Sequence, residues 1–282
     1  MKRTIFILGL LLNTAVFCQD QVKLDLEHYP FSHYGSYMSI MYKNAPGEDI
    51  KSLFIRDISG RRLWQWKGIF KIEPLFEGQP VDFDASANPF GLSISTQHGN
   101  AAICFEDNKT LRVKGEKISL RLTQYVKDGS SQSFPINKKK DQWRIQMGGY
   151  DNYVFTTLAG NLEGDPAKTV TLKPIPERPQ LILTIEPDES GNFEFAFEQY
   201  QDAWVRKNYK KSFNLCLEES KVHFNQFSKK LLDAPNEYND LNELAKYVKW
   251  SSVVKEKDLI KREAYYCSKN TMNAIWPWDN CF

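Results

Sequence analysis

The sequence predicts a mainly β and then α protein, in which a large antiparallel β-sandwich over residues 19–198 is followed by helices. Between Leu24 and about Glu198, apolar residues recur at every second position, which is typical of strands with one buried face. From Gln199 onward glycine is absent and the apolar residues recur at helical spacing. A sheet-only region followed by a helix-only region predicts two domains rather than one mixed fold.

The strands are predicted from short alternating runs that are separated by turn residues. The clearest alternation lies at 118–123 and 193–198, where Ile, Leu or Phe alternates with polar or small residues. Asp107-Asn108 and Ser190-Gly191-Asn192 are typical turn sequences. Many short strands with no helical pattern between them favour an antiparallel sandwich. Further strands are predicted at 37–42, 53–58, 92–96, 102–105, 153–158 and 181–185.

Two helices are predicted after the sandwich. Linker helices are expected over 199–234, ending before Ala234-Pro235, because an apolar stripe runs through Phe213, Cys216, Leu217, Phe224, Phe227 and Leu231. A second helix is expected to start at Asp240, capped by this side chain with Glu243 reaching back. Its buried face is predicted to consist of Leu241, Leu244, Ala245 and Val248.

The composition bounds the possible partners. The 282 residues are 41% hydrophobic and 26% charged, enough for a sizeable core. Lys and Arg number 37 against 35 Asp and Glu, so the net charge of +2 predicts no nucleic-acid partner. The cysteines and the four histidines are scattered without CxxC spacing, so neither a metal site nor a cofactor is expected. Buried free thiols are expected, and only Cys267 and Cys281 are near enough in sequence to suggest a disulfide.

The N-terminus has the pattern of a secretory signal peptide at residues 1–18. Lys2 and Arg3 precede an apolar run, and polar residues follow from Gln19. We therefore expect a secreted or periplasmic protein that begins near Gln19, with no stable membrane insertion, because no later segment is apolar and long enough. Lipidation of Cys18 is the alternative, and the bulky Phe17 before it fits that processing poorly.

Residues 269–282 read KNTMNAIWPWDNCF. This stretch resembles the N-x-x-W-x-W-D-x-x-F signature of glycoside hydrolase family 63, above all its bacterial mannosylglycerate-hydrolase-like and glucosidase-like members. The order of a β-sandwich, connecting helices and a helical domain is similar to several of these enzymes. The resemblance implies that residues 235–282 begin an (α/α)6 barrel.

The resemblance also implies a substrate and a site. Its members are inverting enzymes, so the expected substrates are oligosaccharides or small glycosides with α-linked glucose or mannose. Asp279 is expected to accept hydrogen bonds from hydroxyls of the innermost sugar, with Trp276 and Trp278 shaping the pocket wall. The alternative is that both tryptophans belong to a core and that Asp279 caps the following helix.

No catalytic residue is assigned in this chain. An inverting site needs an acid and a base roughly 6.5–9.5 Å apart, and in the resembling family both lie downstream of the W-x-W-D motif. Glu106-Asp107, Asp82 and Asp84 are expected to be solvated turn or loop residues. The chain is thus expected to be the front portion of a longer hydrolase, inactive by itself. The alternative is a noncatalytic carbohydrate-binding or supporting β-sandwich with a helical tail.

Overall fold

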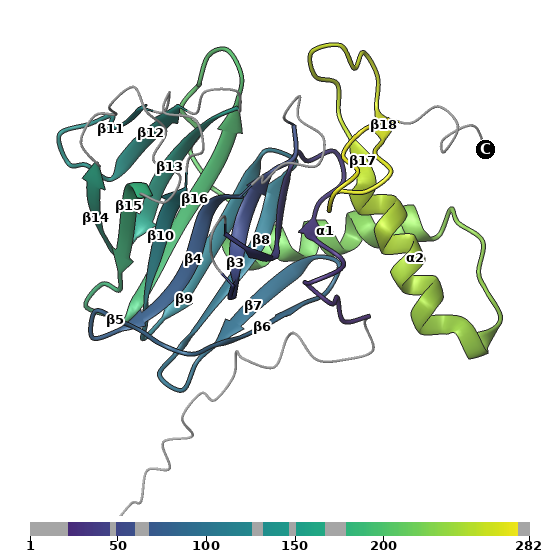
Figure 1. Cartoon of the computed structure of the whole chain (residues 1–282), viewed down its shortest axis with the longest axis horizontal. Coiled ribbons are helices and arrows are strands. Elements are labelled where there is room, and N and C mark those ends of the chain that lie inside the picture. The colour runs from purple at the N-terminus through teal and green to yellow at the C-terminus, as the bar shows by residue number, and fades with distance from the viewer. Residues whose placement is uncertain are drawn as a thin grey trace, which may run out of the picture.

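A computed structural model describes residues 22–45, 49–59, 68–125, 132–146, 151–166 and 179–275. Two antiparallel sheets of eight strands face each other and form a sandwich (Figure 1). The first sheet has the order β1-β2-β3-β4-β10-β15-β14, with β5 beside β4. Its strands are β1 (Phe31–Ser32), β2 (Met38–Asn44), β3 (Lys51–Asp57), β4 (Gly68–Phe76), β5 (Gln79–Pro80), β10 (Ser119–Tyr125), β14 (Asn161–Pro166) and β15 (Pro179–Glu186).

The second sheet has the order β11-β12-β13-β16-β9-β8-β7-β6. Neighbouring strands along the chain pair as hairpins, such as β8 with β9 across the turn at Asp107-Asn108. Its strands are β6 (Asp84–Ala87), β7 (Gly91–Ser95), β8 (Asn100–Asp107), β9 (Thr110–Glu116), β11 (Gln132–Pro135), β12 (Gln142–Gln146), β13 (Asn152–Ala159) and β16 (Asn192–Tyr200).

The predicted alternation is the physical basis of the core. Phe193, Phe195 and Phe197 of β16 are all fully buried between the sheets, where the Phe195 ring stacks on Phe155 with centroids 4.5 Å apart. The residues between them point to the outer face, as Glu194 does in pairing with Arg112. The prediction of a mainly β, sandwich-type fold is confirmed. The described residues do not show the barrel.

Helix α1 (Phe213–Ser228) lies against the outer face of the second sheet, along β8 and β9. Ser212 caps it by accepting a hydrogen bond from the Leu215 amide at 3.2 Å. Phe213, Cys216 and Phe224 are buried as predicted. In Figure 1 this helix crosses behind the sandwich toward α2.

Helix α2 (Asn239–Ser252) follows a short 3-10 turn, η1 (Asn236–Tyr238). The predicted cap at Asp240 is wrong, because this residue lies inside the first turn and the residue before the helix makes no side-chain cap. The predicted buried face is also partly wrong. Leu241 is 64% exposed, whereas Tyr247 and Trp250 are buried. The large rings bury more apolar area than Leu241 would, so they turn their side of the helix inward.

The helices share one hydrophobic cluster with the sandwich. Phe224, Tyr247 and Trp250 pack together with Phe31 and Phe105 from the sheets. The Tyr247 hydroxyl donates to the Pro30 carbonyl at 2.7 Å and accepts from the Ser32 amide at 2.9 Å. The division of the chain at residue 198 stays a prediction, and the predicted signal peptide lies outside the described residues. Within the described ranges, no helix is both long and apolar enough to cross a membrane.

Candidate functional site

The segment that leads to the W-x-W-D motif is residues 253–275, called here the C-terminal segment. It begins with β17 (Val253–Val254), which pairs with β18 (Ala264–Tyr265). The Gly35 amide donates to the Val253 carbonyl at 2.9 Å, and the Lys255 amide donates to the Gly35 carbonyl at 3.2 Å. Gly35 has a φ of +79°, and a Cβ there would stand 2.7 Å from the Lys255 side chain. A glycine is therefore required at this junction.

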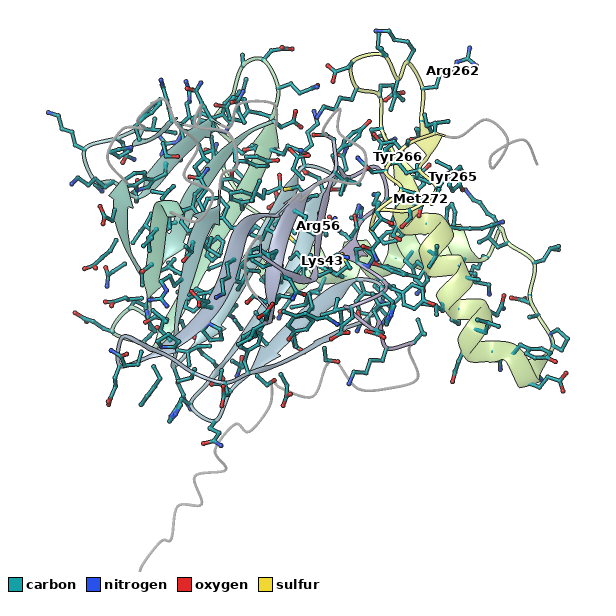
Figure 2. The ribbon with its side chains drawn as sticks, viewed as in Figure 1. Lys43, Arg56, Arg262, Tyr265, Tyr266 and Met272 are labelled. Atoms are coloured by element: carbon teal, nitrogen blue, oxygen red, sulfur yellow. The ribbon has the colours of Figure 1, made fainter. Side chains whose placement is uncertain are left out.

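Arg56 fastens the end of this segment to the first sheet. It projects from the outer face of β3 and is only 3% exposed. Its guanidinium donates to the carbonyls of Lys269 at 3.1 Å and Asn270 at 2.7 Å. Figure 2 shows Arg56 on the sandwich and Tyr266 and Met272 in the segment on the adjacent flank. The contact with Lys269 is buried and that with Asn270 is part-buried, so the cation supplies donors to acceptors that have little access to water.

Lys269 makes the reverse contact, from the segment into the sandwich. Its ammonium group is buried and donates to the carbonyls of Ser36 at 2.7 Å and His33 at 3.1 Å, with the Ser32 hydroxyl at 3.3 Å. Burial holds the pKa of Lys269 well below its ordinary value. Four residues further on, Asn273 donates to the Ile58 carbonyl at 2.8 Å. The backbone leading into the motif is thus held at three buried points.

A carboxylate cluster lies beside these anchors. Asp57 is fully buried, and one of its oxygens accepts from the Ser59 amide at 2.7 Å and from the Ser59 hydroxyl. The other oxygen accepts from the Asp151 amide at 3.2 Å and from the Tyr153 hydroxyl. Four donors occupy the acceptor capacity of a carboxylate. Asp57 has therefore no position left for a water or a sugar hydroxyl, and its role is structural.

Asp151 pairs with Lys257 of the C-terminal segment, and both side chains are about 90% buried. Burial, and then the neighbouring Asp57 charge, raises the pKa of Asp151 to about 6. Two adjacent carboxyl groups, one with a raised pKa, are also typical of acid–base catalysts. Here the Asp57 oxygens are saturated and Asp151 faces a buried lysine, so the cluster clamps Lys257 rather than binding a substrate.

The raised pKa of Asp151 predicts a pH dependence, because burial and the Asp57 charge disfavour the ionised carboxylate more than Lys257 stabilises it. The pKa of Asp151 is about 6 in the folded protein and 3.8 in the unfolded chain, so the folded state binds the proton more tightly. The contribution of this proton to the free energy of unfolding is fully present below about pH 4 and is lost as the pH rises through 6. At about 1.4 kcal/mol per pKa unit, the loss is at most about 3 kcal/mol. In Asp151→Asn this contribution should disappear. The measurement is urea unfolding of wild type and variant between pH 4 and 7, with exposed Asp82→Asn as the control. Parallel pH profiles of wild type and Asp151→Asn would contradict the assignment.

The histidines near α1 and α2 are packing residues. The His33 ring lies 4.7 Å from Trp250 and 5.5 Å from Phe105, measured between centroids. Burial lowers the pKa of His33 to about 4, so the ring is neutral near pH 7. The Trp250 indole donates to His223 Nδ1 at 2.9 Å. This arrangement joins the helices to the sandwich. Among the described residues, no group of three His, Cys, Asp or Glu side chains is placed to hold a metal ion.

A cavity of about 310 Å³ opens on the outer face of the second sheet, between β9, β16 and the start of α1. Arg112 lines this cavity, is 2% exposed at the side chain, and pairs with Glu106 at 2.7 Å and with Glu194. The Tyr209 ring stands 5.8 Å from the guanidinium carbon. Glu106 was expected to be solvated, and this is wrong, because its side chain is 12% exposed in the ion pair. Asp82 and Asp84 are exposed as predicted.

The three predicted sugar-contacting residues, Trp276, Trp278 and Asp279, lie outside the described residues. The described chain leads toward them through Ile275, which is 43% exposed. Their pocket roles and the alternative roles in a core or as a helix cap both stay predictions. The anchors Arg56 and Lys269 were not predicted. The one signal in the sequence was that Asn273 is the first residue of the signature and that Lys269 lies four residues before it.

No protein-family profile matches this chain, and no curated protein sequence matches it. Its fold is similar to that of a solved inverting mannosidase of glycoside hydrolase family GH92 from Bacteroides thetaiotaomicron, with a TM-score of 0.52 and 10% sequence identity. The match covers 85% of this chain and 39% of that structure. A likeness at this identity concerns the fold alone, which is an antiparallel β-sandwich followed by helices. The expected membership of family 63 is not supported.

Proposed function

We propose that this chain is the front part of an exported, inverting glycoside hydrolase that acts on α-linked mannosides or glucosides. The fold supports this class, because the neighbour that shares it is described as an inverting mannosidase. The W-x-W-D motif supports it independently, since carboxylates and aromatic rings are suited to the hydroxyls and apolar faces of a pyranose. The basic and then apolar first eighteen residues support export, with a mature protein that begins near Gln19.

One observation carries the proposal for the role of the sandwich. Buried Arg56 and Lys269 and the amide of Asn273 fix residues 268–273 to the first sheet, directly before Trp276, Trp278 and Asp279. A binding residue needs a rigid support to hold its geometry. In this proposal the sandwich and its two helices are the platform that positions the motif at the entrance of a helical catalytic domain.

The acid and the base of the inverting reaction are proposed to lie outside this chain. The match covers only 39% of the neighbour's length, so a hydrolase of similar size would have most of its residues elsewhere. Within the described part, Asp151, whose pKa is raised, is committed to Lys257, and the neighbouring Asp57 is committed to Tyr153. In this proposal Asp279 holds sugar hydroxyls and the two tryptophans form the wall beside it.

A second function is favoured by the cavity over Arg112. This cavity has the size of a small ligand pocket and carries an aromatic ring and charged groups, which are the components of a sugar-binding surface. A noncatalytic carbohydrate-binding or supporting module would use such a surface without any acid or base. The Arg112 charge, however, is already paired with two carboxylates, which leaves fewer donors for a ligand.

The test is hydrolysis by the protein of the complete natural reading frame, purified from its host after its N-terminus has been located by mass spectrometry. We expect turnover of α-mannosides or α-glucosides with release of the β-anomer, followed by proton NMR. The 282-residue chain is the matched control and is expected to bind sugar weakly and hydrolyse none. A reading frame that stops at Phe282 would favour the binding module. Hydrolysis by the 282-residue chain would contradict the placement of the acid and base outside it.

A further inference from the structure

Two cysteines that are more than a hundred residues apart in the sequence meet between the second sheet and α1. Cys104 projects from the outer face of β8, and Cys216 lies in the first turn of α1. Both are fully buried and form one hydrophobic cluster with Phe213. The Cys104 Sγ also lies 3.9 Å from the Phe213 carbonyl oxygen, within the same turn of the helix. The cluster thus brings the two thiols together at the contact between helix and sheet.

The proximity of the two thiols makes their pKa values unequal. The contact with Cys104 lowers the pKa of the Cys216 thiol below its ordinary value. Burial, and then the contact with Cys216, raises the pKa of Cys104. Cys216 also lies at a helix N-terminus, where partial positive charge favours a thiolate. Because this charge is local to the first turn of α1, it makes Cys216 the better nucleophile of the pair even before α1 packs against the second sheet.

We propose that Cys104 and Cys216 form a disulfide that fastens α1 to the second sheet of the exported protein. The oxidant is a disulfide, either that of a small molecule such as oxidised glutathione or that of a disulfide-exchange protein. The Cys216 thiolate attacks one sulfur of that disulfide and releases one thiol. The Cys104 thiolate then attacks the Cys216 sulfur of the mixed disulfide and releases the second thiol. Two electrons pass to the oxidant, and the two protons lost by the cysteines are taken up by the two released thiols or by the buffer.

The thiol–disulfide exchange takes place during folding, before α1 packs against the second sheet. In the folded chain both sulfurs are buried, so an external disulfide has no access to them. Once formed, the bond would close a loop of more than a hundred residues that contains β9 to β16. Such a loop restricts the unfolded chain strongly, which raises the stability of the folded one. The bond would hold the platform proposed above, but its formation does not depend on any glycosidase activity.

The test uses the 282-residue chain with Cys18, Cys267 and Cys281 replaced by serine, refolded with oxidised glutathione or with dithiothreitol. The oxidised sample is expected to be lighter by about 2 Da, through loss of two hydrogens, and to yield one peptide pair joining Cys104 to Cys216. Its melting midpoint is expected to be roughly 10 °C above that of the reduced sample. The matched control adds Cys104→Ala, and its midpoint should be the same under both conditions.

Two results would overturn the proposal. The first is that both thiols remain titratable in the unfolded state after refolding with oxidised glutathione. The second is a disulfide that forms and leaves the midpoint equal to or below that of the reduced chain, because a bond compatible with the fold should stabilise it. Activity measurements on the longer protein are unaffected by either outcome, so the function proposed above is tested separately.

Discussion

Replacing Arg56 with alanine is expected to release residues 268–275 from the first sheet and to lower the free energy of unfolding by about 3–5 kcal/mol. The variant loses two charge-assisted hydrogen bonds, to the buried Lys269 carbonyl and the part-buried Asn270 carbonyl, and leaves both acceptors without this donor. Each such loss costs roughly 1–3 kcal/mol. Burial already lowers the pKa of Arg56 to about 10, which shows that the cation is costly to bury, and this offsets part of the effect.

Hydrogen exchange measured by mass spectrometry, together with urea unfolding, checks this prediction. Peptides that cover residues 266–275 should exchange faster in the variant, whereas the hairpin of β8 and β9 should not change. Arg121→Ala is the matched control, since it removes an arginine from the outer face of the same sheet, where Arg121 pairs with Glu73 at 3.1 Å and is 27% exposed. A partly exposed pair of this kind contributes about 1 kcal/mol or less. Equal effects of the two substitutions would show that Arg56 is no anchor.

The sandwich could be predicted because alternation directly reports a sheet with one buried face. The runs at 37–42, 53–58 and 181–185 correspond to β2, β3 and β15. The clearest alternations, at 118–123 and 193–198, correspond to β10 and β16. The turn residues Asp107-Asn108 and Ser190-Gly191-Asn192 predicted the β8–β9 and β15–β16 connections, because their turn preference is also a local property. In each case the signal lies within a few neighbouring residues. Tertiary contacts were not needed to read it.

The faces of α2 could not be predicted in the same way. Leu241 and Trp250 are both apolar and lie on different sides of the helix, and the sequence alone does not indicate which side packs against the sandwich. The choice depends on Phe31 and Phe105, which reach α2 from strands more than a hundred residues earlier. Local periodicity therefore identified the helix but assigned part of its buried face wrongly.

The anchors of the candidate site were hidden for a related reason. Arg56 stands on β3 at a position whose neighbours in alternation are buried in the sandwich core, so the pattern predicts a solvated side chain. It is buried because residues 268–275 cover it, and that cover comes from the other end of the chain. Glu106 was misjudged for the same reason, since α1 and the residues before it cover the outer face of the second sheet. Cys104 and Cys216 are buried free thiols as predicted, but local periodicity gave no sign that they meet.

The largest functional effect is expected at Asp279. In the complete hydrolase proposed above, Asp279→Ala should lower kcat/KM on the best α-mannoside or α-glucoside by about 10²–10⁴-fold. This follows if the carboxylate accepts two hydrogen bonds from sugar hydroxyls, each contributing roughly 1.5–3 kcal/mol, at about 1.4 kcal/mol per tenfold change in rate. Asp279→Asn should recover part of the loss, because an amide oxygen still accepts one such bond.

The melting midpoint distinguishes this role from that of a helix cap. A carboxylate that binds sugar can be removed without loss of stability, so the midpoints of Asp279→Ala and wild type should agree, as should that of exposed Asp82→Ala, the control elsewhere on the chain. A cap contributes about 1 kcal/mol to the fold. If the midpoint falls and the activity at low temperature is retained, Asp279 caps a helix.

The anchoring of residues 268–273 adds a further comparison. Arg56→Ala leaves the Asp279 carboxylate in place but loosens its support, so it should raise KM while Asp279→Ala lowers kcat/KM at unchanged stability. If both variants instead lost activity only in proportion to stability, the motif would be part of the fold and the sugar-binding role would be wrong.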